Sequence, residues 1–182
     1  MEDNLMIKGK IIDLKLIEEK DINKYYERGF SFFDEEVMRC TGTKNNPSKE
    51  QINNYLSRIV KDKDRYDFLI LNKDKEIIGE SVLNEIDKEI NSCNFRICLF
   101  KKEYCGKGFG KEAIELTINY GFETLKINRI ELEVFDFNNR AYKAYKNCGF
   151  IEEGRKREAE LIDGKYCDII IMSILRKEYN KK

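Results

Sequence analysis

Histidine is absent from this chain of 182 residues, and its six cysteines include no Cys-x-x-Cys pair. Zinc sites are built mainly from cysteine and histidine at short spacing, so we expect no metal site. The cysteines are instead expected to be free thiols, as in a reducing cytosol. They stand at Cys40, Cys93, Cys98, Cys105, Cys148 and Cys167.

Long apolar runs and a net charge are missing as well. No segment approaches the roughly 18 apolar residues of a membrane span, and residues 1–5 lack the basic and apolar regions of a signal peptide. Lys plus Arg and Asp plus Glu number 34 each, so the net charge is zero. Overall charge therefore favours neither nucleic acid nor an anionic membrane as a partner. We expect a cytoplasmic protein that binds neither of them.

The apolar residues that are present, 41% of the chain, fall into periodic runs that are typical of a folded protein. The length fits a single domain over residues 1–182. Helices are predicted after Asp21, after a capping box at 48–51, from the glycines near residue 108 and after Asn138. Together with the strands this indicates an α/β (α+β) fold. The predicted strands lie at about 8–17, 66–71, 77–83, 95–100, 129–135, 151–161 and 165–175.

Three glycines, Gly106, Gly108 and Gly110, stand at alternate positions between a predicted strand and a predicted helix. Glycine accepts the backbone angles of a tight turn and lets a ligand approach the main chain, so successive N–H groups can converge on an anion. The N-terminus of the following helix also favours a phosphate. Taken alone, such a turn also fits a simple tight connection.

Two common nucleotide loops are excluded by the spacing. In a Walker A loop, Ser or Thr follows the Gly-Lys pair, whereas Glu112 follows Gly110 and Lys111 here. The dinucleotide fingerprint is G-x-G-x-x-G, and this turn reads G-x-G-x-G. The turn therefore predicts an anion site of another kind.

A second motif follows about 30 residues later and consists of Asn138, Ala141, Tyr145, Gly149 and Phe150. The two motifs together resemble those of the GNAT superfamily of acyl-CoA-dependent N-acetyltransferases. Residues 105–110 are similar to the family's pyrophosphate loop, Q/R-x-x-G-x-G/A, except at the first position, and the later residues match N-x-x-A-x-x-x-Y-x-x-x-G-F. The predicted order of elements resembles the family along essentially the whole chain. It looks most like the branch of ribosomal-protein N-terminal and spermidine acetyltransferases.

The resemblance implies a mixed, mostly antiparallel central sheet of about seven strands with helices on both faces. It also implies that acetyl-CoA donates an acetyl group to a primary amine of a small amine, a polyamine or a peptide N-terminus, and it is compatible with a homodimer. In the family, the strand before the loop binds the pantetheine arm through main-chain groups, and the loop holds the pyrophosphate. The donor-binding residues implied here are Cys98, Leu99, Phe100, Cys105, Gly106, Lys107, Gly108, Phe109, Gly110, Lys111, Asn138 and Ala141.

Tyr145 is the candidate catalytic residue. The resemblance assigns the matching tyrosine as the general acid that protonates the leaving thiolate, and a phenol is protonated at neutral pH. Tyr145 lies two helical turns after Asn138 and shares its side of the helix. The alternative interpretation is a core aromatic residue.

The base that deprotonates the amine is less well marked. With no histidine in the chain, it is expected to be a carboxylate or a water chain that ends on one. Four carboxylates near the relevant strands are candidates, and each also fits an ordinary surface charge. They are Glu85, Asp87, Glu131 and Glu133.

Cys105 departs from the family pattern, because it removes one side-chain contact to the pyrophosphate. Lys107 and Lys111 are candidates to compensate, and both also fit solvated surface lysines. The departure keeps a second function open, that of a non-catalytic domain that binds acyl-CoA as a sensor or interaction module. Retention of Tyr145 favours the enzyme.

An aromatic and acidic segment, residues 32–36, lies between the first two predicted helices. The resemblance places it beside the acceptor, where three carboxylates would attract a cationic amine. In the alternative interpretation, Phe32 and Phe33 pack inward, and the acids are ordinary charges at a helix start.

Overall fold

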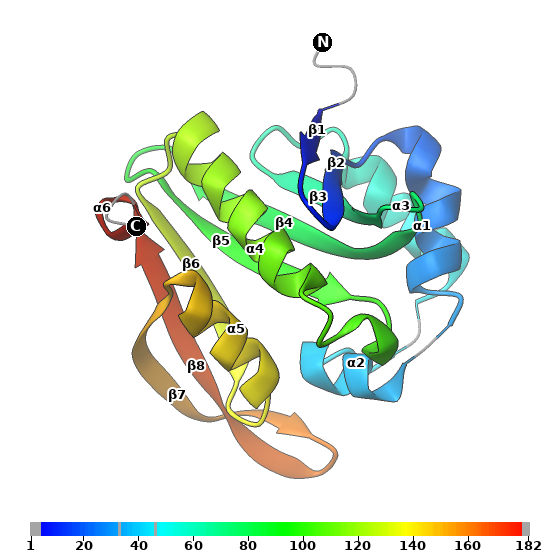
Figure 1. Cartoon of the computed structure of the whole chain (residues 1–182). Helices are drawn as coiled ribbons and strands as arrows, with labels where there is room; N and C mark the ends of the chain where they lie inside the picture. Colours follow the sequence, from blue (N-terminus) through cyan, green and yellow to red (C-terminus); the bar gives the residue numbers. More distant parts are fainter. Residues whose placement is uncertain (1–4, 33, 46, 180–182) are drawn as a thin grey trace.

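The computed structural model describes residues 5–32, 34–45 and 47–179 (Figure 1). This part of the chain has helices on a mixed sheet, as the sequence predicts. The helical elements are η1 (Glu19–Asp21), α1 (Ile22–Gly29), α2 (Glu35–Thr41), α3 (Lys49–Ile59), η2 (Lys102–Tyr104), α4 (Phe109–Asn119), η3 (Tyr120–Thr124), α5 (Asn139–Cys148) and α6 (Arg176–Tyr179). The strands are β1 (Met6–Lys8), β2 (Ile12–Leu16), β3 (Tyr66–Asn72), β4 (Ile77–Asp87), β5 (Ser92–Leu99), β6 (Arg129–Phe135), β7 (Ile151–Ile162) and β8 (Lys165–Leu175).

The strands form one sheet in the order β1-β2-β3-β4-β5-β6-β8-β7, in which β5 and β6 are the parallel pair and the other neighbours are antiparallel. The pairing of β5 with β6 is short, because it joins only residues 92–94 to residues 129–131. Beyond these residues the two strands run apart (Figure 1). The sheet is therefore split along one strand boundary.

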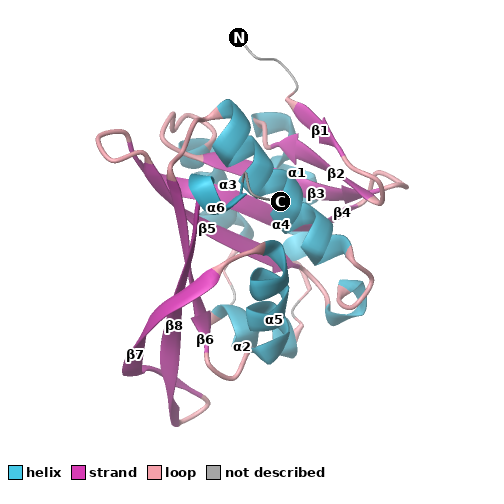
Figure 2. Ribbon diagram, turned by 60° about the vertical axis from the view of Figure 1, so that its left-hand side comes forward, coloured by secondary structure: helices cyan, strands magenta, loops and turns pink. Residues whose placement is uncertain are grey.

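Strand β3 shows how both faces of the sheet are covered. Phe68 and Ile70 are buried in a cluster that includes residues of α4 and α5, whereas Leu69 and Leu71 belong to a second cluster with α1 and α3. Successive side chains of a strand point to opposite faces. Figure 2 shows α4 on one side of the sheet and α1 and α3 on the other. The predicted two-sided arrangement is confirmed.

The predicted capping box of α3 is present. Ser48 Oγ accepts a hydrogen bond from the Gln51 backbone N–H at 3.2 Å, and Gln51 Oε1 accepts one from the Ser48 N–H at 2.8 Å. The expected cap at Asp21 is wrong, because its side chain accepts no bond from the start of α1. The Asp21 carboxylate instead accepts the Glu18 N–H at 3.0 Å and belongs to the turn before the helix.

Helix α2 is an element that the sequence pattern does not predict. It begins where Asp34 Oδ1 accepts hydrogen bonds from the backbone N–H groups of Glu36 and Val37, at 3.1 and 3.2 Å. It ends at Gly42, whose φ of +67° is left-handed. With seven residues, this helix is too short to show a clear periodicity.

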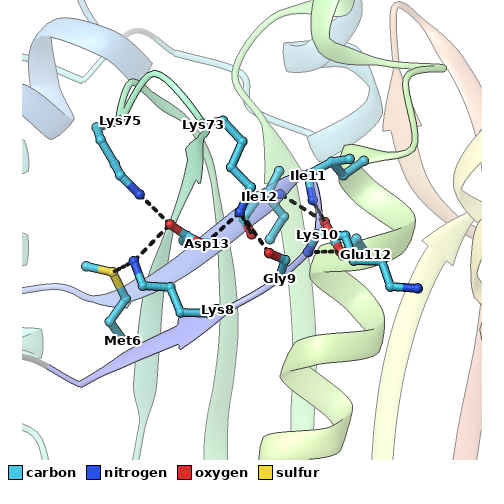
Figure 3. Close-up of polar contacts among 10 residues, drawn as sticks. All are labelled: Met6, Lys8, Gly9, Lys10, Ile11, Ile12, Asp13, Lys73, Lys75 and Glu112. Atoms are coloured by element: carbon cyan, nitrogen blue, oxygen red, sulfur yellow. Dashed lines mark hydrogen bonds and ion pairs between the residues drawn. The ribbon is translucent and has the colours of Figure 1, made fainter.

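The first predicted strand, at about 8–17, is divided into the two strands β1 and β2, so the sheet has eight strands instead of about seven. The chain turns at Gly9, whose N–H donates to the Ile12 carbonyl at 3.0 Å. The turn is held from outside by the carboxylate of Glu112 in α4 (Figure 3). That carboxylate accepts the backbone N–H groups of Lys10, Ile11 and Ile12 at 2.6, 2.8 and 2.9 Å.

Asp13 on β2 is a buried carboxylate among three lysines (Figure 3). Its oxygens lie 3.1 Å from Lys8 Nζ, 3.0 Å from Lys73 Nζ and 2.5 Å from Lys75 Nζ. Burial alone raises the pKa of Asp13, but the hydrogen bonds from Lys75, Lys73 and Lys8 outweigh it and hold the pKa well below its ordinary value. These contacts tie the first hairpin to the β3–β4 turn.

Replacing Asp13 with asparagine is expected to lower the free energy of unfolding by about 1 to 3 kcal/mol at pH 7, because three cations lose their carboxylate. Because the folded-state pKa is depressed, this stabilisation is fully present above the unfolded value of about 3.9 and is lost progressively as the pH falls below it toward the folded-state pKa. Urea unfolding at pH 7 and pH 3 should therefore show the gap between wild type and Asp13→Asn narrowing in acid. Asp74→Asn, at an exposed position of the β3–β4 turn, is the control. A gap that is independent of pH would contradict this account.

The six cysteines are all free. Among the residues that the structure describes, no helix is long and apolar enough to cross a membrane. Within the same residues, no three side chains of His, Cys, Asp or Glu are grouped so that they could hold a metal ion.

Candidate active site

A cavity of about 800 Å³ opens where β5 and β6 separate, and we call it the central cavity. One wall is formed by residues 95–100 in and after β5, and another by residues 133–135 of β6. The turn that holds the three glycines and parts of α1, α2, α4 and α5 also line it, together with single residues of other elements such as Glu80 of β4. The split in the sheet creates this space, since two diverging strands cannot fill the gap between them with their own pairing.

The wall from β5 contains Cys98, Leu99 and Phe100. On one side this stretch pairs with β4, where Cys98 stands opposite Glu80. On the other side the pairing with β6 has ended at Asn94. The edge of β5 that faces the cavity is therefore available to an extended ligand that adds to the sheet through main-chain hydrogen bonds.

The glycine turn, residues 104–110, closes one end of the cavity. Gly106 and Gly108 have φ values of +75° and +85°, which other residues rarely adopt. Gly108 is the N-cap of α4, so the unsatisfied N–H groups and the positive dipole end of that helix begin at the turn. The arrangement suits an anionic group.

Not all of the predicted pyrophosphate-binding residues face the cavity. Lys107 is exposed and is not among the described lining residues, and Phe109 packs against the main core. The others do line it. They are Cys105, Gly106, Gly108, Gly110 and Lys111.

Gly108→Val is expected to weaken acetyl-CoA binding and to leave the protein folded. A Cβ at this position would lie 3.2 Å from Ile11 Cδ1, and a β-branched residue at this φ costs about 1 to 3 kcal/mol. The side chain would also block approach to the main chain. Calorimetry would measure the affinity, and Gly164→Val, at a φ of +73° in the β7–β8 turn, is the control with matched strain. Unchanged affinity in Gly108→Val would remove the turn from the binding site.

Helix α5 carries the second motif into the cavity. Asn138 Oδ1 accepts the Ala141 N–H at 3.2 Å and caps the helix, and both residues line the cavity. Two turns later, Tyr145 lies in the same wall with 7% of its surface exposed. Its ring packs edge-on against Phe95 and Phe150, at centroid distances of 6.3 and 5.8 Å.

The environment of Tyr145 keeps its phenol protonated. Burial raises the pKa of Tyr145 above its ordinary value, and the neighbouring Cys98 and Cys148 raise it further. A group that donates a proton must be protonated before the reaction, and this one is so throughout the neutral pH range. The position and protonation state suit a general acid, although packing against the core is part of the same environment.

The four carboxylates expected as the base occupy different places. Glu133 lines the central cavity and forms an ion pair with Lys156. Glu131 is paired with a neighbouring arginine, Glu85 is exposed, and Asp87 accepts two backbone N–H groups of its own turn. These last three are not among the described residues that line the cavity.

Sequence reasoning misses Glu80 on β4, which lines the cavity. Its Oε2 accepts a hydrogen bond of 2.5 Å from the hydroxyl of Tyr25, a buried residue of α1. Burial and the charge of Glu80 raise the pKa of Tyr25, so its hydroxyl remains a donor. A signal was present, because Glu80 is the only charged residue of the predicted strand 77–83.

The segment of residues 32–36 agrees with the alternative interpretation for its acids but not for Phe32. Phe32 is 74% exposed and does not pack inward, and Phe33 lies outside the described residues. Asp34 caps α2 and lines the cavity, and Glu36 forms two ion pairs. Glu35 is exposed and is not among the described lining residues. The acids therefore act mainly at the helix start, as the alternative interpretation expects.

Comparison with known proteins gives a consistent result. The sequence model of a protein family, "Acetyltransferase (GNAT) domain", matches residues 12–151. The chain is 32% identical over 132 residues to the spermidine N(1)-acetyltransferase of Vibrio cholerae, covering 72% of this chain and 76% of that protein. It is 26% identical to a prophage-derived, uncharacterized N-acetyltransferase of Bacillus subtilis, covering 94% of this chain and 93% of that one.

Solved structures give the same picture. The crystal structure of spermidine N-acetyltransferase from Vibrio cholerae in complex with CoA and spermine aligns with a TM-score of 0.85 and 27% identity. The alignment covers 94% of this chain and 99% of that one.

Proposed function

Because the chain belongs to the GNAT family of acetyltransferases, which use acetyl-CoA, we propose that it transfers the acetyl group to a primary amine of a polyamine. The observation that carries this proposal is the central cavity. It brings the glycine turn, the open edge of β5, Tyr145 and Glu80 into one space.

The donor would bind along the lining already described. The pyrophosphate is anionic and would meet the free N–H groups of the glycine turn and of the start of α4. The pantetheine amides would pair with the open edge of β5 around Leu99, because the Phe100 N–H donates to the Ile78 carbonyl of β4 at 3.0 Å and Cys98 stands opposite Glu80. Asn138 and Ala141 lie in the same cavity, at the start of α5. Acetyl-CoA supplies the thioester that the amine attacks.

The acceptor amine has to lose a proton before it can attack. An alkyl ammonium with a pKa near 10.4 is neutral in only about one molecule in 2,500 at pH 7, which costs about 4 to 5 kcal/mol. We assign this deprotonation to Glu80, directly or through a water molecule, because it is a carboxylate in the cavity wall opposite Cys98. The Tyr25 hydroxyl orients it.

The leaving thiolate needs a proton at its sulfur. A thiol has a pKa of about 8.5, so the thiolate is a better leaving group when a nearby acid protonates it. We assign this step to Tyr145, whose phenol is protonated and lies in the wall of the cavity. The two proton transfers are thus assigned to two different residues of the cavity wall, Glu80 on β4 and Tyr145 on α5.

A polyamine acceptor is supported by the named relative and by the charge of the cavity. The Vibrio cholerae relative is named as a spermidine acetyltransferase, and its solved complex holds spermine. Among the described residues that line the cavity, carboxylates outnumber cationic side chains, which favours a cationic acceptor. The carboxylates are Asp34, Glu80, Glu133 and Glu160, and the cations are Arg96, Lys111 and Arg140.

The proposal is tested by following thiol release from acetyl-CoA with spermidine, spermine, simple monoamines and peptides with free N-termini. We expect the highest kcat/KM with the polyamines and a value that falls as salt is added, because salt screens the attraction of a cationic acceptor. Equal or higher kcat/KM with peptides, insensitive to salt, would favour N-terminal acetylation. Tight acetyl-CoA binding without turnover of any amine would instead favour the sensor.

A further inference from the structure

The glycine turn has Cys105 at its first motif position, where the family pattern that it resembles has Arg or Gln. A neutral thiol is a poor partner for a pyrophosphate, and burial raises the pKa of Cys105 above its ordinary value. A guanidinium in its place would give charged, bidentate hydrogen bonds. The inference below rests on the proposed binding of acetyl-CoA at this turn. If the donor's pyrophosphate binds there, a cation from elsewhere in the chain has to replace the charged side chain that position 105 lacks.

We propose that Arg140, from the first turn of α5, binds the donor's pyrophosphate in place of the missing side chain at position 105. Arg140 and Cys105 line the same central cavity. They are 35 positions apart in sequence, and the fold brings α5 and the glycine turn to this one space. In this proposal, Arg140 of α5 supplies the positive charge that Cys105 does not provide at the glycine turn.

Ion pairs hold Arg140 near the turn. Its Nη1 lies 2.8 Å from Glu36 Oε1, and the other oxygen of Glu36 lies 2.6 Å from Lys102 Nζ. Lys102 belongs to the segment that leads into the glycine turn, and its carbonyl accepts a hydrogen bond from the Cys105 N–H at 2.9 Å. Glu36 therefore links α5 to the segment that leads into the glycines. The side chain of Arg140 is 45% exposed, so its fork can reach a bound anion.

The lysines that the sequence offers are weaker candidates. Lys107 is exposed and is not among the described residues that line the cavity. Lys111 does line it, but its ammonium is a single point charge without a planar fork of donors. Arg140 has five donors in a planar fork, which matches two phosphate oxygens at once. The combination of cavity position and geometry favours Arg140.

The test is isothermal calorimetry with CoA, dephospho-CoA and pantetheine, without any acceptor amine. Arg140→Gln is expected to weaken CoA binding by about 10- to 100-fold, the range for lost charged hydrogen bonds. Dephospho-CoA, which keeps the pyrophosphate and lacks the 3′-phosphate, should show the same loss. Pantetheine, which has no phosphate, should bind both proteins equally.

Two further variants separate anion binding from packing. Glu36→Gln removes the ion pair that holds Arg140 near the turn but keeps the guanidinium, so it should weaken CoA binding clearly less than Arg140→Gln does. Cys105→Arg in the Arg140→Gln background should restore most of the affinity, because it returns the family's residue to the turn. Thermal unfolding of each variant would verify that it is folded.

Three results would overturn the assignment. They are CoA affinity unchanged in Arg140→Gln, an equal loss for pantetheine, and a loss that disappears with dephospho-CoA, which would assign Arg140 to the 3′-phosphate. Failure of this inference differs from failure of the proposed function. If the wild-type protein binds CoA and acetylates an amine, the function stands whatever Arg140 does.

Discussion

Replacing Tyr145 with phenylalanine is expected to lower kcat by about 10- to 1,000-fold and to change acetyl-CoA affinity little. The change removes only the hydroxyl, so the ring keeps its edge-on contacts with Phe95 and Phe150. The leaving thiolate would then depart without a proton from the protein. Steady-state kinetics with the best amine, together with calorimetry for the donor, would separate the two quantities.

Tyr142→Phe is the matched control for this variant. Tyr142 lies one turn earlier on α5, and its hydroxyl donates to Glu152 at 2.8 Å. It is not among the described residues that line the cavity, so its loss should leave kcat nearly unchanged. Wild-type turnover in Tyr145→Phe would make Tyr145 a packing residue of the core and would remove the proposed acid.

Glu80→Gln is expected to lower kcat/KM for the amine by about 100- to 10,000-fold at neutral pH, the usual effect of losing a general base. Glutamine keeps the size of the side chain and can still accept a hydrogen bond from the Tyr25 hydroxyl, but it cannot take a proton from the ammonium group. Because the amine must then lose its proton to solvent, the rate of the variant should rise with pH more steeply than that of wild type. Measuring kcat/KM from pH 6 to pH 9.5 would show this difference.

Glu133→Gln tests the competing carboxylate of the cavity. Glu133 is exposed and paired with Lys156, so its replacement should have a much smaller effect on kcat/KM. If Glu133→Gln caused the large loss and Glu80→Gln did not, the base would be on β6, which carries two of the four carboxylates that the sequence suggests. Equal, small effects in both variants would favour a water chain that ends elsewhere.

Features that depend on neighbouring residues in the sequence are the ones that could be predicted. The glycine turn, the capping box of α3 and the spacing from Asn138 to Tyr145 each lie within a dozen residues, and each is present in the structure. Backbone angles and helix ends are determined over this range. The order of strands and helices follows from periodicity in the same way.

The remaining features depend on contacts between distant residues. The split of the first strand requires Glu112, and the link from Arg140 to the turn requires Glu36 on α2, a helix too short to be seen in the sequence. Glu80 appears as one charge in an apolar strand until the pairing of β4 with β5 places it opposite Cys98. No local pattern contains these partners.

The hydrogen bonds from Lys10, Ile11 and Ile12 to Glu112 also limit how early the first hairpin can reach its folded position. They join residues 100 to 102 positions apart, so during synthesis the first hairpin leaves the ribosome well before its carboxylate partner exists. At about 5 to 20 residues per second, the three N–H groups remain bonded to water for roughly 5 to 20 s. Closing so long a loop is also slow compared with forming a helix. The beginning of the chain is thus expected to be among the last parts to reach its final place.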